Sequence, residues 1–184
     1  MDDLTRVSLG LLAAWAVHDA EELLTMSPAS AVVLPELPHW LPIPESMRTY
    51  GVSQAHVNLA IGIMAVPVAV SSLEGVRTRG ASPLLRGGVL AFGLHGLGHV
   101  AGALARGGYT TGVLTSPTLV IPYWLWASRV LARHGLPRAD RGAVLTALGV
   151  IPLLPVVHGT VLTILGRRSI RAHQSPAHQG LWRR

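Results

Sequence analysis

The chain has 184 residues, of which 49% are hydrophobic and 13% are charged, and it contains no cysteine. Its mean hydropathy of +0.43 is too high for an ordinary soluble domain and is typical of a small polytopic membrane protein. The lack of cysteine excludes disulfides, a thiolate nucleophile, thiolate zinc sites and Cys-ligated iron–sulfur clusters. The net charge of +6 comes from arginines in short loops between apolar runs, where they meet lipid headgroups, so we expect no nucleic-acid partner.

Apolar runs dominate the chain, and five of them are long enough, or nearly so, to cross a bilayer as helices. The first run carries no convincing cleavage site, so we expect it to remain as a first helix rather than to be removed as a signal peptide. The predicted fold is an all-α bundle of about five transmembrane helices, in a single domain over residues 1–184 with a membrane core at 4–166. In chain order the runs cover residues 4–25, 54–76, 84–106, 112–132 and 142–166.

A proline-rich segment follows the first run. Residues 28–48 contain five prolines, which exclude a regular helix or a central strand. We expect an ordered loop or re-entrant cap on the membrane surface here. The polar, arginine-rich stretch 167–184 is predicted to be a loose terminal segment.

Histidines are frequent for so apolar a chain, with nine in total. Five fall inside the apolar runs, where an ionisable group indicates a functional site. They are His18, His56, His95, His99 and His158. The other four are expected to be solvated surface residues, namely His39, His134, His173 and His178.

The first run holds its polar residues close together. His18, Glu21 and Glu22 are related as i, i+3 and i+4, so they share one face of a helix. Asp19 is expected to point elsewhere. Since Glu21 and Glu22 are about 100° apart on a helix, we expect different roles for them. One would bind or bridge a metal ion, while the other acts as general base or orients a histidine.

The later runs add further candidate ligands. His95 and His99 are related as i and i+4, the spacing by which one helix offers two ligands to a single metal centre. Asn58 is two residues from His56 and leaves the helix in a different direction, so we expect it to hydrogen-bond a ligand rather than to bind metal.

The polar positions also share one depth. Antiparallel helices alternate in direction, so residues meet when they are late in odd runs and early in even ones. At about 1.5 Å per residue, the candidate ligands lie roughly 16–30 Å above a common starting face. They therefore converge in one half of the membrane, on the side of the proline-rich segment.

The energetics favour bound cations at this depth. A carboxylate in hydrocarbon costs at least a few kcal/mol, and neighbouring carboxylates repel each other. Five imidazoles and two glutamates exceed the needs of one ion, so we predict two divalent ions, with iron favoured and zinc as the alternative. In the competing interpretation, these groups only hydrogen-bond across helices. The predicted ligands are His18, Glu21, Glu22, His56, His95, His99 and His158.

The motif HDAEE at residues 18–22 resembles the one that names the HXXEE-domain family of small bacterial integral membrane proteins. HVN at 56–58, HGLGH at 95–99 and His158 resemble the polar positions expected in that family. The resemblance implies a multi-pass protein of the bacterial inner membrane with a His/Glu site of metal-binding type. It supplies no established reaction, so the function is inferred from the residues.

We expect an integral membrane enzyme that acts on a lipophilic small molecule reaching the site from the membrane lipid. Mixed histidine and carboxylate ligands with open positions suit a di-iron oxidoreductase catalysing hydroxylation, desaturation or rearrangement, with an external electron donor. A zinc-dependent hydrolase with Glu21 or Glu22 as base is the first alternative. The second is a transporter or proton relay, against which the lack of a detectable inverted repeat weighs.

Overall fold

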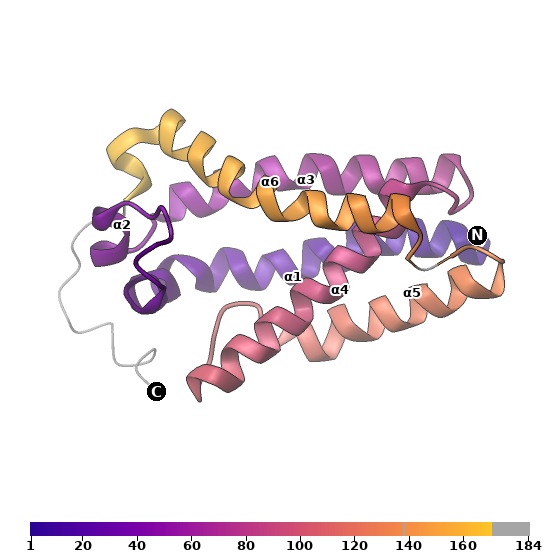
Figure 1. Ribbon diagram of the computed structural model, residues 1–184, viewed down its shortest axis with the longest axis horizontal. Coiled ribbons are helices and arrows are strands. Elements are labelled where there is room, and N and C mark those ends of the chain that lie inside the picture. Colours follow the sequence, from indigo (N-terminus) through magenta and orange to yellow (C-terminus); the bar gives the residue numbers. More distant parts are fainter. Residues whose placement is uncertain (138, 171–184) are drawn as a thin grey trace.

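The described residues, 1–137 and 139–170, form a helical bundle in the computed structural model, as predicted. An isolated antiparallel bridge joins Val52 to Ile170. Helices α1, α3 and α6 run along the long axis, and α4 crosses them at a slant (Figure 1). The elements are α1 (Asp3–Val33), η1 (Leu34–Glu36), α2 (Glu45–Tyr50), α3 (Gln54–Arg77), α4 (Pro83–Arg106), η2 (Ser116–Val120), α5 (Ile121–Arg133), α6 (Arg141–Leu165) and η3 (Gly166–Ser169).

Side-chain caps fix where the long helices begin. The side chains of Asp2, Ser53, Ser82 and Asp140 each accept a bond from a backbone N–H in the first turn of α1, α3, α4 and α6. These residues satisfy N–H groups that have no partner within the helix. At the other end, α4 is closed by Gly107, whose left-handed φ of 69° suits a residue without Cβ. Because each helix begins at a fixed residue, the position of every site residue along its helix follows from the local sequence.

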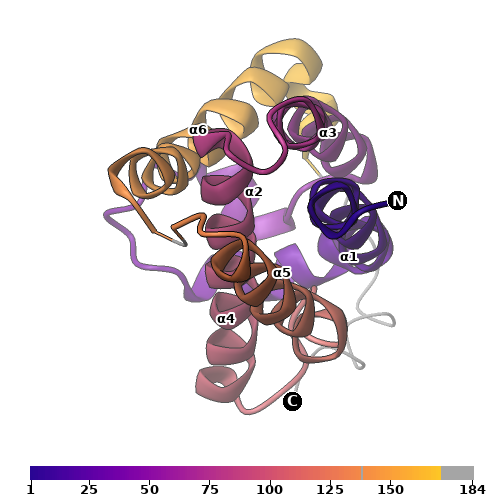
Figure 2. The same cartoon turned by 90° about the vertical axis from the view of Figure 1, so that its right-hand side faces the viewer.

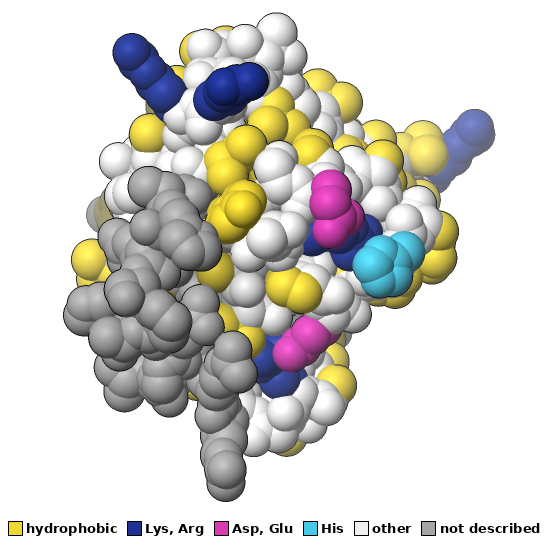
Figure 3. All heavy atoms as spheres, turned by 90° about the vertical axis from the view of Figure 1, so that its left-hand side faces the viewer, with side chains coloured by type: hydrophobic (Ala, Val, Ile, Leu, Met, Phe, Trp, Pro, Cys, Tyr) yellow, Lys and Arg dark blue, Asp and Glu magenta, His cyan; other side chains and the backbone are white. Residues whose placement is uncertain are grey.

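The first helix extends eight residues further than expected at its C-terminal end, since α1 ends at Val33 and not at residue 25. It passes through Pro28, and α2 covers residues 45–48, so the expectation that 28–48 forms no regular helix was wrong at both of its ends. Beyond α1, the buried Arg48 donates hydrogen bonds to four backbone carbonyls. These carbonyls belong to residues between 34 and 41, so Arg48 orders the proline-rich segment. Figure 3 views this end of the molecule, where acidic and basic side chains are scattered among hydrophobic ones.

Three described helical stretches are long and apolar enough to cross a membrane: α3, α4 and α6 together with η3. Their most apolar windows are mostly unburied, so hydrophobic side chains face outward, as lipid requires. The other two expected spans differ. Helix α1 carries charged residues in its middle, and the run 112–132 is divided into a loop, the wider turns of η2 and the 13-residue α5. Prolines at 117 and 122 explain the division, because they lack the N–H that a regular helix needs.

The main core lies between α1, α4 and α5. Figure 2, turned by 90° from Figure 1, shows α1 beside α3. Helix α4 contacts both α5 and α6. Tyr123 on α5 donates a hydrogen bond to the Val7 carbonyl of α1 at 2.7 Å. This core holds α1 and α4 in a fixed relation, which positions the polar residues one level further along both helices. Its fully buried members include Val7, Leu11, Leu85, Val89, Val120, Ala127 and Val130.

Candidate metal centre

Four of the seven predicted ligands converge at one point. His18 and Glu22 come from α1, and His95 and His99 come from α4, each pair at i, i+4 spacing. One ligand atom from each lies within 4.8 Å of all the others. His18 is fully buried and Glu22 is 5% exposed, whereas the side chain of His95 is 41% exposed, so the centre is buried on the side of α1 and open at His95.

The distances fit a single ion. Glu22 Oε1 lies 3.8 Å from His18 Nε2 and 3.9 Å from His95 Nε2. It lies 3.2 Å from His99 Nε2. His95 Nε2 is 3.2 Å from His18 Nε2 and 2.8 Å from His99 Nε2. Ligands about 2.0–2.1 Å from a metal ion stand roughly 3.3 Å apart at the corners of a tetrahedron. The observed separations fall on both sides of that value, so small side-chain shifts suffice to hold an ion.

Glu21 binds the loop between α4 and η2 instead of this centre. Its Oε1 accepts hydrogen bonds from Tyr109 Oη at 2.6 Å and from Leu114 N at 3.2 Å. Its Oε2 accepts from Thr115 N at 2.9 Å and from Thr115 Oγ1 at 2.6 Å. Burial and the bond to Glu21 raise the pKa of Tyr109 to about 12, so Tyr109 keeps its proton at neutral pH. Both carboxylate oxygens are thus occupied by donors.

Thr115 links Glu21 to the centre. Its Oγ1 lies 2.7 Å from His18 Nδ1. A hydroxyl has one proton, and a carboxylate only accepts, so the Thr115 proton goes to Glu21 and its oxygen accepts from His18 Nδ1–H. The lone pair of His18 is therefore on Nε2, the atom that faces the other three ligands. Such outer hydrogen bonds commonly fix the tautomer of a metal-binding histidine.

The same loop presses its backbone against two of the ligands. Gly112 has a φ of 75°, a left-handed conformation that favours glycine. A Cβ at this position would stand 2.8 Å from both His18 Cε1 and His99 Cε1. Glycine is thus required twice over, for the turn and for the close approach to the rings.

The remaining predicted ligands form a separate pair. His56 Nε2 lies 2.8 Å from His158 Nδ1, and the two rings are stacked. His56 is fully buried, and its Nδ1 has no partner among the described residues. Asn58 is exposed and accepts a hydrogen bond from Gln54 Nε2 at 2.8 Å. The structure therefore does not bring His56, His158 or Asn58 into the group of four.

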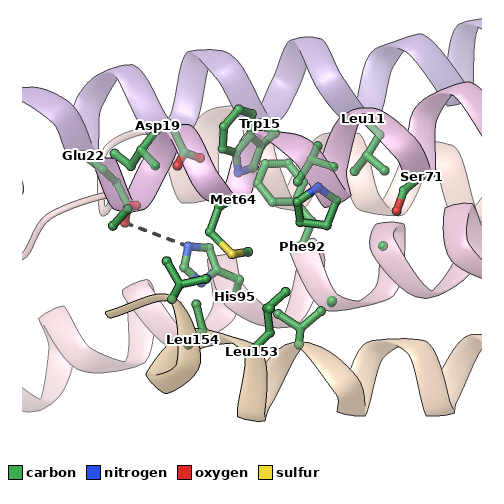
Figure 4. Close-up of a pocket in the computed structure, with 18 of the residues that line it drawn as sticks. Leu11, Trp15, Asp19, Glu22, Met64, Ser71, Phe92, His95, Leu153 and Leu154 are labelled. Atoms are coloured by element: carbon green, nitrogen blue, oxygen red, sulfur yellow. Dashed lines mark ion pairs between the residues drawn. The ribbon is translucent and has the colours of Figure 1, made fainter. Parts of the chain in front are cut away.

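Asp19 was missed by the sequence analysis, which expected it to point elsewhere. It is only 6% exposed and lines the same cavity as Glu22, so that expectation was wrong. The signal was present, because Asp19 and Glu22 are related as i and i+3 and such residues are neighbours on a helix. Figure 4 shows Asp19 beside Glu22 and Trp15 at the cavity wall.

A cavity of about 500 Å³ leads to the centre. It lies between α1, α3, α4 and α6, and its lining on α4 extends from Leu84 to His99, about 22 Å along the helix. Apart from the groups near the centre, its walls are mainly apolar. Figure 4 shows His95 and Glu22 at one end of this apolar space. The lining also includes Leu11, Met64, Val68, Phe92, Leu153 and His158.

Tyr109, Gly112 and Thr115 were also missed. They lie in or next to a stretch with three glycines, GGYTTG at 107–112, which is a loop signal at the start of a run interpreted as a helix. His39 and His134 are exposed as predicted. His173 and His178, with the rest of the tail from residue 171, lie outside the described residues.

Comparison with known proteins identifies one family. A family model described as a protein of unknown function with HXXEE motif matches residues 9–127. The matched region includes all of α4 and most of α1, with all four residues of the group. Comparisons with curated proteins and with solved structures give no significant match.

Proposed function

We propose that this chain, which belongs to the HXXEE family, is a multi-pass enzyme of the bacterial inner membrane that uses a metal ion to transform a lipophilic small molecule. The observation that carries the proposal is the position of the four convergent ligand groups at the end of an apolar cavity. A bound cation would offset the free-energy cost of burying the Glu22 carboxylate. The cavity would let a substrate reach that cation.

One ion fits the geometry better than the pair first expected. The second ion would need Glu21, His56 and His158. Glu21 is saturated by four donors from the loop, and the two histidines bond each other. We therefore propose a mononuclear centre of His18, His95, His99 and Glu22, with Glu21 as a positioning residue.

The ligand count favours iron over zinc. Zinc is usually four-coordinate, and its catalytic sites keep one of the four positions for water. Four protein ligands would close such a site, whereas iron accepts more ligands and is found with mixed histidine and carboxylate sets that leave positions open. When bound, iron would supply dioxygen activation for a hydroxylation, in which one oxygen atom enters a C–H bond and the other leaves as water, with two electrons and two protons from an external donor.

The chain's own residues prepare this site. The carboxylate of Glu22, which is 5% exposed, would offset part of the cation's charge, and its burial strengthens that interaction. The apolar walls exclude water and orient a hydrocarbon chain toward the ligands. The outward-facing apolar helices let such a substrate arrive from the bilayer.

Metal analysis of wild-type protein and two variants tests the proposal. Purified in detergent from iron-replete cells, wild-type protein should contain about one iron per chain. His99→Ala removes one ligand and should lose most of it. His134→Ala removes an exposed histidine outside the group and should keep it, which controls for general effects of losing an imidazole.

The outcomes are distinct. Iron that depends on His99 but not on His134 supports the proposal, and oxidation of a lipid extract with dioxygen uptake would extend it. If the purified protein is colourless and contains one zinc ion, the proposed reaction becomes a hydrolysis in which Glu22 acts as base. Wild-type protein that neither retains metal nor binds added Fe²⁺ or Zn²⁺ would overturn the metal centre.

A further inference from the structure

Asp19 is a buried carboxyl group without a bonded partner. It is 6% exposed, and no hydrogen bond or ion pair joins it to another residue within 1–137 and 139–170. A buried polar group normally has a partner, because leaving it unsatisfied costs free energy. The side chain faces the cavity, so its partner would come from whatever occupies that space.

The cavity wall supplies no partner for it. Figure 4 shows Asp19 between Trp15 and Glu22, with Met64 and Phe92 among the neighbouring cavity residues. Glu22 is itself acidic and adds repulsion. An incoming hydrogen-bond donor would relieve both the unsatisfied group and part of that repulsion.

The proposed metal ion does not serve as the missing partner of Asp19. The four atoms that lie within reach of one ion come from other residues, and Asp19 is not among them. Asp19 directly follows the ligand His18 and precedes the ligand Glu22 by three residues, so it lies at the level of the centre and faces the cavity beside it. A molecule in the cavity that reaches the ion therefore comes close to this carboxyl group.

We propose that Asp19 is the specificity-determining residue of this site, and that the substrate is an amphiphile with a hydroxyl or amine close to the atom that reacts. This proposal rests on the proposed function, since it takes the four-ligand group as the reacting centre. The donor of the substrate meets Asp19, and its hydrocarbon chain lies against the apolar walls.

The size of the cavity agrees with such a molecule. From Glu22 back to Leu11, the lining on α1 extends about 16 Å. Beyond Asp19 this part is bordered by apolar residues such as Leu11, Val68 and Leu153. A linear chain of medium length therefore fits the space with its polar group at Asp19.

The test uses three probes with the same chain: 1-dodecanol, dodecylamine and 1-methoxydodecane. The ether accepts hydrogen bonds but cannot donate one. Binding is measured by calorimetric titration into metal-loaded protein in nanodiscs, with empty nanodiscs subtracted. Partition into lipid is the same for every variant, so it cancels when the alcohol-to-ether affinity ratio is compared between variants.

In wild-type protein the alcohol should bind about 2- to 10-fold more tightly than the ether, the range of one ordinary hydrogen bond. Asp19→Leu should reduce that ratio to near one. Asp19→Asn keeps an acceptor, so it should retain much of the alcohol preference but lose a preference for dodecylamine that depends on charge. Ser71→Ala changes another polar cavity residue and should leave the ratio unchanged.

Equal binding of alcohol, amine and ether by wild-type protein would overturn the role of Asp19. A ratio that persists in Asp19→Leu would overturn it too. Metal content is measured on the same preparations, so a failed metal centre is distinguished from a failed recognition residue. If Asp19→Leu does not fold, the isosteric Asp19→Asn variant provides the test. It should lose the preference of wild-type protein for dodecylamine, and a preference that persists would overturn the proposal.

Discussion

Replacing Thr115 by valine should weaken metal binding without changing any proposed ligand. The Thr115 hydroxyl donates to Glu21 at 2.6 Å and accepts from His18 Nδ1 at 2.7 Å. Valine has nearly the same shape but no hydroxyl, so the buried Nδ1–H loses its acceptor and the tautomer is no longer fixed. Loss of such an outer hydrogen bond typically lowers metal affinity about 10- to 100-fold, which corresponds to roughly 1.4–2.8 kcal/mol.

The assay is a competition titration of the loaded protein against a chelator of known affinity. Thr115→Ser keeps the hydroxyl and should bind metal nearly as tightly as wild-type protein. Thr118→Val is the matched control, because among the described residues Thr118 Oγ1 bonds only the Leu114 carbonyl of its own helical turn, at 2.6 Å. If Thr115→Val holds the ion as tightly as Thr115→Ser, the link from Glu21 to His18 does not tune the centre.

Two further predictions concern the loop at the centre and the start of α6. Gly112→Ala should lower metal affinity, because its Cβ would stand 2.8 Å from ring atoms of two ligand histidines. Gly107→Ala, which has a similar φ of 69° but nothing within 4 Å of a Cβ, should cost folding stability alone; equal metal loss in both variants would contradict the contact argument. Asp140→Asn should lower the melting temperature at neutral pH, because it removes the charge partner of the buried Arg86, 2.6 Å away, while keeping a good helix cap. The Ala143 N–H and then Arg86 hold the pKa of Asp140 below its usual 3.8, so this stability is fully present above that value and is lost as the pH falls through the lowered pKa. The difference in melting temperature between wild-type and Asp140→Asn protein should therefore be constant near neutral pH and shrink in strong acid; a difference that grows on acidification would refute the ion pair.

The helical fold and the central part of the site could be predicted from sequence because both depend on short-range spacing. Apolar runs of sufficient length indicate helices, and the two i, i+4 pairs place His18 with Glu22 and His95 with His99 on single faces. The depth argument then brings the two helices together at the correct level. These inferences need only the geometry of a helix and the alternation of direction.

What could not be predicted depends on how helices rotate against each other. The depth argument gives His56 and His158 the same height as the other ligands, but height does not determine direction. In the structure the two rings face each other, outside the group of four. The role of Glu21 was also out of reach, because its four donors come from a loop about 90 residues away whose path no local pattern indicates.

The five positions from His18 to Glu22 carry three carboxyl groups because a helix separates their directions. At about 100° per residue, His18 and Glu22 are only about 40° apart, which suits two ligands of one ion. Glu21 lies about 60° to one side of His18, and Asp19 lies about 60° to the other side of Glu22. The first of these reaches the loop and the second reaches the cavity. One helical turn thus supplies the ligands, the group that orients them and the group proposed to recognise the substrate, and moving any of the three acids by one position would aim it at the wrong neighbour.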